Sequence, residues 1–570
     1  MKTLKYISIT ATALAFVLSF NACTEGFEEI NKNPNDLELK NLTPDYLFGT
    51  SPINTAMLMA GNSNWIVFGN FTQQLSVVGG TYPHYGRGGN EGEIWSKFYV
   101  DCIKPVVQLE KIYKDDKNYT NRVAIAKIWK YYLFSEAVSL WGDIPFSEAA
   151  LGQETTAYEK DFDIYKQILD GLNTAANELK DGGDGYAEKS EPIFKSNVDK
   201  WRKFAHSIRL RVAMRVTEYE EPYGEGLAAM ARQIVNEELS NNNIISNNKE
   251  DNCFITFGEA TKEQNPFYRL ITSATLTDAD YGNVPMAHTS FMLWLKAYKD
   301  PRLSIFYEKS KTAFTKTDYI GRPSSFDRPK GINYESNPYE GDYSNKNLSQ
   351  LTNEFKWITA KYHFITYPEI CCIRAEAAQK GYWTGKSAEV CYYDAIESFS
   401  DRYSTNTSID LKEYMNQPGI KWSTPADTVK KSKEFYDYNG ISDCYLGDAQ
   451  DNLKRIVLQH WIALFYQGMD SWTLLRRTQE IKLPPHWNAD LNTAGVIPSA
   501  DYKHAYIPQR LMYPNSQETL NTKNVKQAIA NLKGGQDLMT TRLRWAKPVK
   551  TFEGPEYPND GYPNTAIVKE

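Results

Sequence analysis

Apolar side chains recur at three- and four-residue spacing in several long segments, and this periodicity is what most constrains the fold of the chain. Between residues 121 and 141 the recurring residues are Ile125, Ile128, Trp129, Tyr132, Leu133, Ala137, Leu140 and Trp141. This spacing places them along one face of an α-helix. Asn121 is the expected N-cap, and Gly142 followed by Pro145 is the expected stop. We predict a buried helix over these residues.

Two further segments show the same pattern. One predicted helix runs from about Asp199 to Glu218, and its apolar stripe is Trp201, Phe204, Ala205, Ile208, Val212 and Val216. Another begins at Leu453 and carries Ile456, Val457, Trp461, Leu464 and Phe465. Because Trp129, Trp141 and Trp201 lie on such stripes, we expect them in the core and not in a ligand site.

A pair of short helices is predicted between residues 368 and 403. Pro368 suits a first helical turn, Gly381 ends that helix, and Ser387 caps the next one. In the second helix the spacing of Ala388, Tyr392 and Ala395 is typical of a tetratricopeptide repeat. No strict 34-residue period occurs elsewhere, so any further repeats are degenerate.

Long segments rich in Gly, Pro, Asn and Tyr separate the predicted helices, at residues 79–92, 181–197, 240–290, 314–356, 404–450 and 482–510. Loops of this length in a compact chain commonly bind ligands or partners. The 570 residues are 41% hydrophobic and 13% aromatic, which suffices for a large core. These features predict an all-α scaffold with long irregular insertions.

The N-terminus has the pattern of an export signal. Lys2 and Lys5 precede an apolar or small run over residues 7–20, which is too short to span a bilayer, and Ala22 precedes Cys23. This arrangement predicts a lipoprotein signal peptide over residues 1–22 and a lipid on Cys23. An ordinary signal peptide is the alternative, since Phe20 and Asn21 stand where a lipobox usually has Leu and a small residue. No other segment reaches the ~18 apolar residues of a membrane span.

No known catalytic or cofactor motif stands out in the sequence. GxSxG, HExxH, CxxC and the phosphate-binding loop GxxxxGKS or GxxxxGKT are absent, and the seven His are scattered. The acidic groups of residues 181–185, Asp278 and Asp280 resemble calcium ligands but lack the Glu of an EF-hand loop, which favours ordinary turns. With a net charge of -6 and no dense basic run, nucleic-acid binding is not expected. We predict no cofactor, no metal and no enzymatic activity.

Several segments together resemble the SusD/RagB family of surface lipoproteins from Bacteroidetes. They are the post-signal segment 27–36 (FEEINKNPND), residues 141–149 (WGDIPFSEA), residues 200–215 (KWRKFAHSIRLRVAMR), residues 367–378 with Tyr-Pro-Glu-Ile and Arg-Ala-Glu-Ala-Ala, and residues 508–514 (PQRLMYP) with Glu518 and Asn521. They follow one another in the family's order over nearly the whole chain.

The resemblance implies four tetratricopeptide-type helix pairs that form a scaffold. The extended leader would cover residues 23–45, and one SusD-like helical domain would cover residues 46–570, with insertions at about 240–356 and 404–450. It also implies an outer-membrane, cell-surface lipoprotein that captures an oligosaccharide and serves as the lid of a SusC-like TonB-dependent transporter. No catalytic chemistry is required of such a protein.

In that family the ligand cleft is built by loops after the first helices and by the central insertion. The matching positions are Tyr82, Tyr85, Arg87 and Asn90 in the first loop, and Tyr281 and Tyr319 in the insertion. Packing of these Tyr within their own loops is the alternative for each of them. Peptide capture by the same architecture, a surface helical hydrolase, and a purely structural surface protein stay open as other functions.

Overall fold

The computed structural model describes residues 42–76, 90–152, 155–272, 284–310, 319–321, 348–399, 409–425, 448–481, 483, 486–487, 504–505 and 507–548. The first half of the described chain contains α3 (Pro44–Ala60), η2 (Ser63–Phe68), α4 (Gly69–Phe71), β1 (Leu75–Ser76), α5 (Asn90–Ser96), η3 (Lys97–Ile103), α6 (Lys104–Tyr113), η4 (Lys117–Tyr119), α7 (Thr120–Trp141), α8 (Asp161–Glu178), α9 (Val198–Val216), α10 (Leu227–Asn241), α11 (Asn248–Asp251), β2 (Cys253–Thr256) and α12 (Pro266–Thr272).

The second half contains β3 (Met286–Ala287), α13 (Thr289–Ala297), α14 (Leu303–Phe306), α15 (Asn353–Lys356), β4 (Lys361–Ile365), α16 (Tyr367–Gln379), α17 (Ala388–Ser398), α18 (Lys412–Asn416), α20 (Asn452–Ala463), α21 (Gly468–Thr478), β5 (His486–Trp487), β6 (His504–Ala505), α22 (Asn515–Leu520), α23 (Thr522–Asn531) and η9 (Lys533–Gly535). The described strands pair in twos: β1 with β3, β2 with β4, and β5 with β6, all antiparallel.

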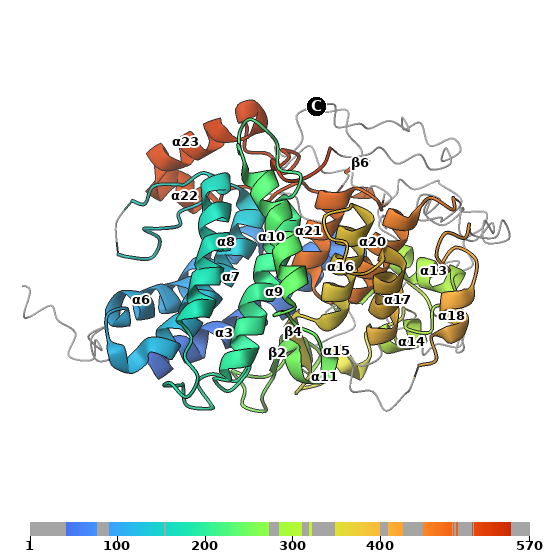
Figure 1. Cartoon of the computed structure of the whole chain (residues 1–570), viewed down its shortest axis with the longest axis horizontal. Coiled ribbons are helices and arrows are strands. Elements are labelled where there is room, and N and C mark those ends of the chain that lie inside the picture. Colours follow the sequence, from blue (N-terminus) through green and yellow to red (C-terminus); the bar gives the residue numbers. More distant parts are fainter. Residues whose placement is uncertain are drawn as a thin grey trace, which may run out of the picture.

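Helices that follow one another in the sequence pack in pairs: α7 with α8, α9 with α10, α16 with α17, and α20 with α21. Figure 1 shows α7 to α10 side by side, with α16, α17 and α20 continuing the array and α22 and α23 lying across one end. The all-α class and the tetratricopeptide-type scaffold are confirmed. In the part of the chain that the structure describes, no helix is both long and apolar enough to cross a membrane.

The predicted helix over residues 121–141 is α7, and its apolar stripe is buried, with Trp129 and Trp141 fully inaccessible to solvent. It ends at Gly142, whose φ of 84° is a backbone conformation that suits glycine. The N-cap prediction is wrong, because the helix begins at Thr120 and Asn121 lies inside it. Instead, the carboxylate of Asp184 accepts hydrogen bonds from the backbone N–H groups of Asn121 (2.8 Å) and Arg122 (3.3 Å).

The helix pair α16–α17 follows the sequence prediction closely. Pro368 lies in the first turn of α16, Gly381 has a φ of 72° just after the helix, and the Ser387 hydroxyl accepts from Val390 N–H at 3.3 Å. The predicted stripe of α17 is buried from Cys391 to Phe399. Five described cysteines, Cys102, Cys253, Cys371, Cys372 and Cys391, are free and buried, so no disulfide framework links them.

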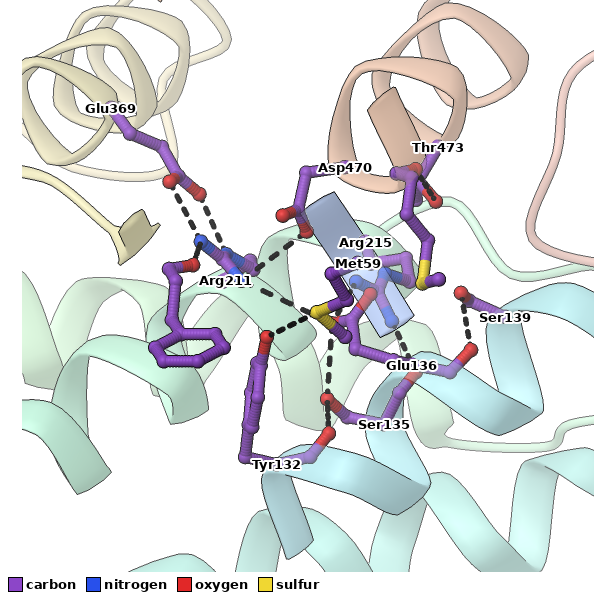
Figure 2. A network of polar contacts seen from close by, with 12 residues as sticks. Met59, Tyr132, Ser135, Glu136, Ser139, Arg211, Arg215, Glu369, Asp470 and Thr473 are labelled. Carbon is purple, nitrogen blue, oxygen red and sulfur yellow. Dashed lines mark hydrogen bonds and ion pairs between the residues drawn. The ribbon is translucent and has the colours of Figure 1, made fainter. Parts of the chain in front are cut away.

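Ion pairs tie the helices together inside the scaffold (Figure 2). Arg211 on α9 donates from Nε and Nη2 to both oxygens of Glu369 on α16, at 2.6 and 2.7 Å, and its Nη1 lies 3.2 Å from Asp470 on α21. Arg215, one turn further, pairs with Glu136 on α7 at 3.2 Å. These side chains are at most 9% exposed. One arginine-rich face of α9 therefore joins α7, α16 and α21.

The C-terminal segment closes the end of α7. Arg510, fully buried, donates from Nη2 to the carbonyl of Trp141 at 2.9 Å and pairs with Asp537. Leu511 N–H donates to the Leu140 carbonyl at 2.8 Å, and the Tyr513 hydroxyl donates to the Asp143 carbonyl at 2.7 Å. Two of the segments that carry the family resemblance, 141–149 and 508–514, thus meet in the core.

Candidate functional site

An open cleft of about 690 Å³ lies where three segments distant in sequence meet. Its walls come from the end of α3 and the start of η2 (residues 57–65), from the boundary of α5 and η3 (residues 93–97), and from the turn and helix α12 (residues 261–272). A volume of this size lies within the range of small-molecule sites in proteins. None of these walls belongs to the α7–α10 array.

Both N-terminal walls of the cleft contain π-helix. Ser63–Phe68 and Lys97–Ile103 wind as π-helical segments, and the cleft is lined by the start of each. Gly61 separates α3 from η2, and a Cβ there would lie 2.6 Å from the Met57 carbonyl oxygen. π-Helical turns are rare and recur at functional sites, where the extra residue redirects side chains. The π-helical backbone of these walls thus distinguishes the cleft from the regular α-helices of the scaffold.

The lining of the cleft combines apolar and charged side chains. Apolar contacts are offered by Met57, Leu58, Trp65, Ile94, Pro266 and Leu270. Uncharged hydrogen-bonding groups come from Asn62, Ser63, Thr261, Gln264 and Thr272, and charges from Glu93, Lys97, Lys262 and Arg269. Lys97 Nζ lies 3.0 Å from Glu93 Oε1. An amphipathic ligand with apolar faces and many hydroxyls fits such a lining.

The described segments on either side of residues 77–89 and 273–283, which contain Tyr82, Tyr85, Arg87 and Tyr281, lie at or near this cleft. Strand β1 precedes residues 77–89 and pairs with β3, which follows residues 273–283, through the register Leu75↔Ala287 and Ser76↔Met286. On their other sides, α5 follows the first segment and α12 precedes the second, and both helices line the cleft. Strand β1 also contacts η2, which forms one wall of the cleft.

Most of the predicted site residues lie outside the described part of the chain. These are Cys23, Tyr82, Tyr85, Arg87 and Tyr281. Asn90 is the first residue of α5, at the foot of the cleft wall, and its side chain is not described.

Tyr319 is described. It is partly buried against the core, and Lys309 Nζ lies 5.9 Å from its ring centroid. Its neighbour Ile320 exchanges hydrogen bonds with Ser349, which in turn bonds to β3 through Ala287 N–H at 2.8 Å. Tyr319 thus lies beside the β1–β3 sheet and is not part of the cleft lining.

The described lining itself was not predicted from the sequence. Lys262, Arg269 and Leu270 come from residues 240–290, where the sequence predicted only an irregular segment and the structure has α11, β2, α12 and β3. A usable signal was present in residues 266–272 (PFYRLIT), where one arginine interrupts an aromatic and apolar run that begins with a helix-starting Pro.

An exposed tryptophan lies near α12. Trp357 is 53% exposed, and its ring packs against Tyr268 of α12 with 6.3 Å between ring centroids. Asn265, just before α12, holds this position, because its Nδ2 donates to the Phe355 and Trp357 carbonyls at 2.7 and 2.9 Å. Exposed aromatic faces of this kind suit stacking against a ligand.

The ion-paired interior of Figure 2 contains titratable side chains with shifted pKa values and only a small cavity. The cavity among Arg211, Glu369, His460 and Asp470 measures about 30 Å³, enough for a water molecule and far too small for a sugar. Burial raises the pKa of Asp470 to about 8, against the opposing effect of Arg211. Burial also lowers the pKa of His460 to about 3. These shifts follow from burial within the scaffold.

A second open hollow of about 330 Å³ lies between the start of α8 and the α23–η9 segment. Its carboxylates are engaged: Asp143 accepts from Asp161 N–H at 3.0 Å and from Asn531 Nδ2 at 3.0 Å, and Asp161 accepts from the Tyr219 hydroxyl at 2.7 Å. Burial, reinforced by the neighbouring Asp143, raises the pKa of Asp161 to about 7. This network joins the end of α7 to the C-terminal segment.

Over the described residues, no group of three or more His, Cys, Asp or Glu is arranged to hold a metal ion. The acidic turn at residues 181–185 has other roles there, since Asp184 caps α7 and Asp181 pairs with Arg202 at 2.7 Å.

Comparisons with known proteins agree with this architecture. Residues 40–514 match a SusD-like family model described as starch-binding and associating with the outer membrane. No curated protein sequence matches the chain. Among solved structures, a SusD homologue from Bacteroides uniformis has a TM-score of 0.69 at 20% identity and covers 88% of this chain and 99% of its own.

A chitin-binding SusD homologue from Flavobacterium johnsoniae has a TM-score of 0.66 at 19% identity, with 86% of this chain and 98% of that chain covered. A further structure, of a chitin-binding protein, has a TM-score of 0.65 at 22% identity over 88% of this chain. At these identities the structures establish a common fold. Because the family model spans most of the sequence, the chain belongs to the SusD-like family.

Proposed function

We propose that this chain is a cell-surface nutrient-binding lipoprotein that captures an oligosaccharide in the cleft between η2, α5 and α12. The observation that carries the proposal is the cleft of about 690 Å³, which is lined by α5 and α12, the helices next to residues 77–89 and 273–283. Membership of the SusD-like family and the likeness to two chitin-binding proteins support a glycan as the ligand class.

The chemistry of the cleft suits sugar rings. Sugars present apolar C–H faces edged by hydroxyls, and the lining alternates apolar side chains such as Leu270 with hydrogen-bonding groups such as Gln264. We include Tyr82, Tyr85, Arg87, Asn90 and Tyr281 in the proposal as further ligand-binding residues. Trp357 supplies a further stacking face on the neighbouring side of α12.

A hydrolase finds no support in the described residues. Glycoside hydrolysis needs two carboxylates facing one accessible bond. Among the described residues, the cleft lining contains a single carboxylate, Glu93, which is paired with Lys97. Turnover is therefore not part of the proposal.

The test is isothermal titration of the purified protein with neutral and charged oligosaccharides and, separately, a mixed peptide digest. Oligosaccharide heat that disappears when Asn62→Trp fills the cleft is the expected result, because Asn62 is exposed at the wall. Asn118→Trp on η4, also exposed but outside the cleft, is the matched control and leaves binding unchanged. Binding of the digest alone moves the protein to the peptide alternative. Heat that survives in Asn62→Trp places the ligand elsewhere and refutes the cleft.

The proposal includes an anchor and a partner. Residues 1–22 are removed as the signal peptide, Cys23 carries the lipid, and residues 23–45 lead to the helical domain, which acts as the lid of a SusC-like TonB-dependent transporter in the outer membrane. Cys23→Ser is expected to move the protein from the membrane to the soluble fraction. Co-purification of the lipidated protein with a co-expressed SusC-like transporter tests the partner, and separate elution of the two contradicts it.

A further inference from the structure

The cleft has the opposite charge balance from the rest of the chain. The whole sequence has 70 acidic and 64 basic residues, whereas the described lining of the cleft has one carboxylate and three cations, Lys97, Lys262 and Arg269. A cleft lined by one sign of charge concentrates its field and attracts ligands of the other sign. The cleft therefore differs in the sign of its charge from the acidic chain as a whole.

Two of the three cations have no partner among the described residues. Lys97 is occupied by Glu93 at 3.0 Å. Arg269 and Lys262 form no ion pair and no side-chain hydrogen bond in the described part of the chain, and both are exposed to solvent. The acidic neighbour Glu263 does not line the cleft, and its carboxylate lies near Gly258. The two free cations therefore present their charge to whatever enters the cleft.

Their surroundings fit a charged sugar better than a neutral one. The guanidinium of Arg269 is a planar fork that matches a carboxylate or sulfate with two parallel hydrogen bonds, and Lys262 supplies a compact charge. Next to them Pro266 and Leu270 offer apolar contact for the C–H face of a ring. A neutral glycan of the same shape would use the apolar wall and leave both cations hydrated and unused.

We propose that the cleft selects oligosaccharides that carry negative charge, as uronate carboxylates or sulfate esters, and that Arg269 and Lys262 are the specificity-determining residues. This inference rests on the proposed function and narrows its ligand class. Anionic groups on successive sugar rings would contact the two cations, while the rings lie against Pro266 and Leu270.

The experiment compares ligands that differ only in charge. Trigalacturonate is titrated beside its fully methyl-esterified form, and a sulfated galactan oligosaccharide beside its desulfated form, so that the two pairs separate carboxylate from sulfate recognition. The charged member of at least one pair is expected to bind about tenfold more tightly or better, with the advantage shrinking at high ionic strength. Arg269→Gln and Lys262→Gln each remove most of this advantage and leave the neutral member unaffected.

Lys412→Gln, an exposed lysine on α18 outside the cleft, is the matched control and retains the preference. Equal binding of charged and neutral members, abolished by Asn62→Trp, overturns the charge selectivity while the proposed function stands. Silence towards every sugar, or binding of acidic peptides alone, overturns both. A charge preference that persists in the Arg269→Gln, Lys262→Gln double variant refutes the assignment of these residues.

Discussion

The interior of the helical scaffold and the rim of the cleft use charged side chains in opposite ways. Inside, Arg211 satisfies its guanidinium with Glu369, Asp470 and the Phe364 carbonyl. At the rim, Arg269 has no such partner among the described residues. A buried ion must be paired because desolvation is expensive, whereas a hydrated ion at a surface carries no such requirement. Pairing therefore separates charges that hold the fold from charges available to a ligand.

The sequence segments that carry the family resemblance contribute their charged residues to the interior of the scaffold. Arg211 and Arg215 lie in segment 200–215, Glu369 in segment 367–378, and Arg510 in segment 508–514, and all four are buried in ion pairs or carbonyl contacts. These motifs identify the scaffold. None of these four residues lines the cleft in which we propose that the ligand binds.

Removal of Arg211 is the change with the largest expected effect. Arg211→Met leaves Glu369 and Asp470 buried without their shared cation, and the free energy of unfolding is expected to fall by about 3–5 kcal/mol. Urea denaturation followed by circular dichroism measures the loss. A loss below about 1 kcal/mol would show that the interior tolerates unpaired charge and would remove the distinction drawn above.

Gly142 tests the same scaffold through its backbone. Gly142→Ala forces a Cβ into a backbone with φ of 84° and to within 3.0 Å of Leu543 Cδ2, at an expected cost of about 1–3 kcal/mol in stability. Ligand affinity of the folded variant should not change, because α7 does not line the cleft. Gly182→Ala, at φ of 69° in open space, is the control with the smaller loss.

His460 tests the buried interior through the dependence of the free energy of unfolding on pH. Burial, helped by Arg477, lowers its pKa to about 3, against about 6.5 in the unfolded chain. Between these values only the unfolded state takes up the proton, so stability falls as the pH falls, by up to about 1.4 kcal/mol per pH unit. In His460→Met this contribution disappears, and the slope of unfolding free energy between pH 6 and pH 4.5 becomes correspondingly less steep.

The raised pKa values of Asp161 and Asp470 have the opposite effect. As the pH rises towards 7 and 8, their deprotonation lowers the free energy of unfolding of the protein. Both aspartates are present in the wild-type protein and in His460→Met, so their contributions cancel when the two curves of unfolding free energy against pH are subtracted. Parallel pH curves for the two proteins would mean that His460 does not stay neutral in the folded chain.

Trp357 tests the aromatic face beside the cleft. Trp357→Ala removes a half-exposed ring, and the affinity for an oligosaccharide is expected to fall by about 1 kcal/mol, or about fivefold. The effect should grow with ligand length if the sugar chain extends from the cleft across α12. Isothermal titration with a length series measures it, and equal affinity at every length would exclude this ring from the site.

The smallest effect is expected at an exposed ion pair. Lys386 Nζ lies 3.3 Å from Asp394 with its side chain 52% exposed, and Lys386→Ala should change stability by less than about 0.5 kcal/mol. Urea denaturation of Lys386→Ala and Arg211→Met under the same conditions compares the free energy of unfolding lost at an exposed and at a buried ion pair.

The sequence predicted the scaffold well because its determinants are local. The stripe from Ile125 to Trp141 specifies a helix by its own spacing, and the Ser387 cap and Gly381 stop each act within one turn. The prediction of Asn121 as an N-cap was wrong because the group that caps α7 is not local in sequence. Its N–H is bound by Asp184, which is 63 residues away in the sequence and near only in the folded chain.

The cleft was less accessible to sequence reasoning. The loops predicted to build it lie largely outside the described residues, and the described lining carried only a weak local signal, the PFYRLIT run at residues 266–272. Whether Arg269 is paired or free depends on which side chains the fold brings near it. No local spacing rule supplies that information, whereas the helical period of 3.6 residues supplies the scaffold directly.

The cleft wall also depends on the far end of the chain. Asn64, in η2, donates to the Tyr466 carbonyl at 3.0 Å and accepts from Gly468 N–H at 3.1 Å, more than 400 residues later. Contacts of such sequence separation form late in folding, because a long loop must close before they contribute. A chain interrupted before α21 thus lacks the support for its own binding wall. Ligand binding would then report that synthesis of the chain has passed α21.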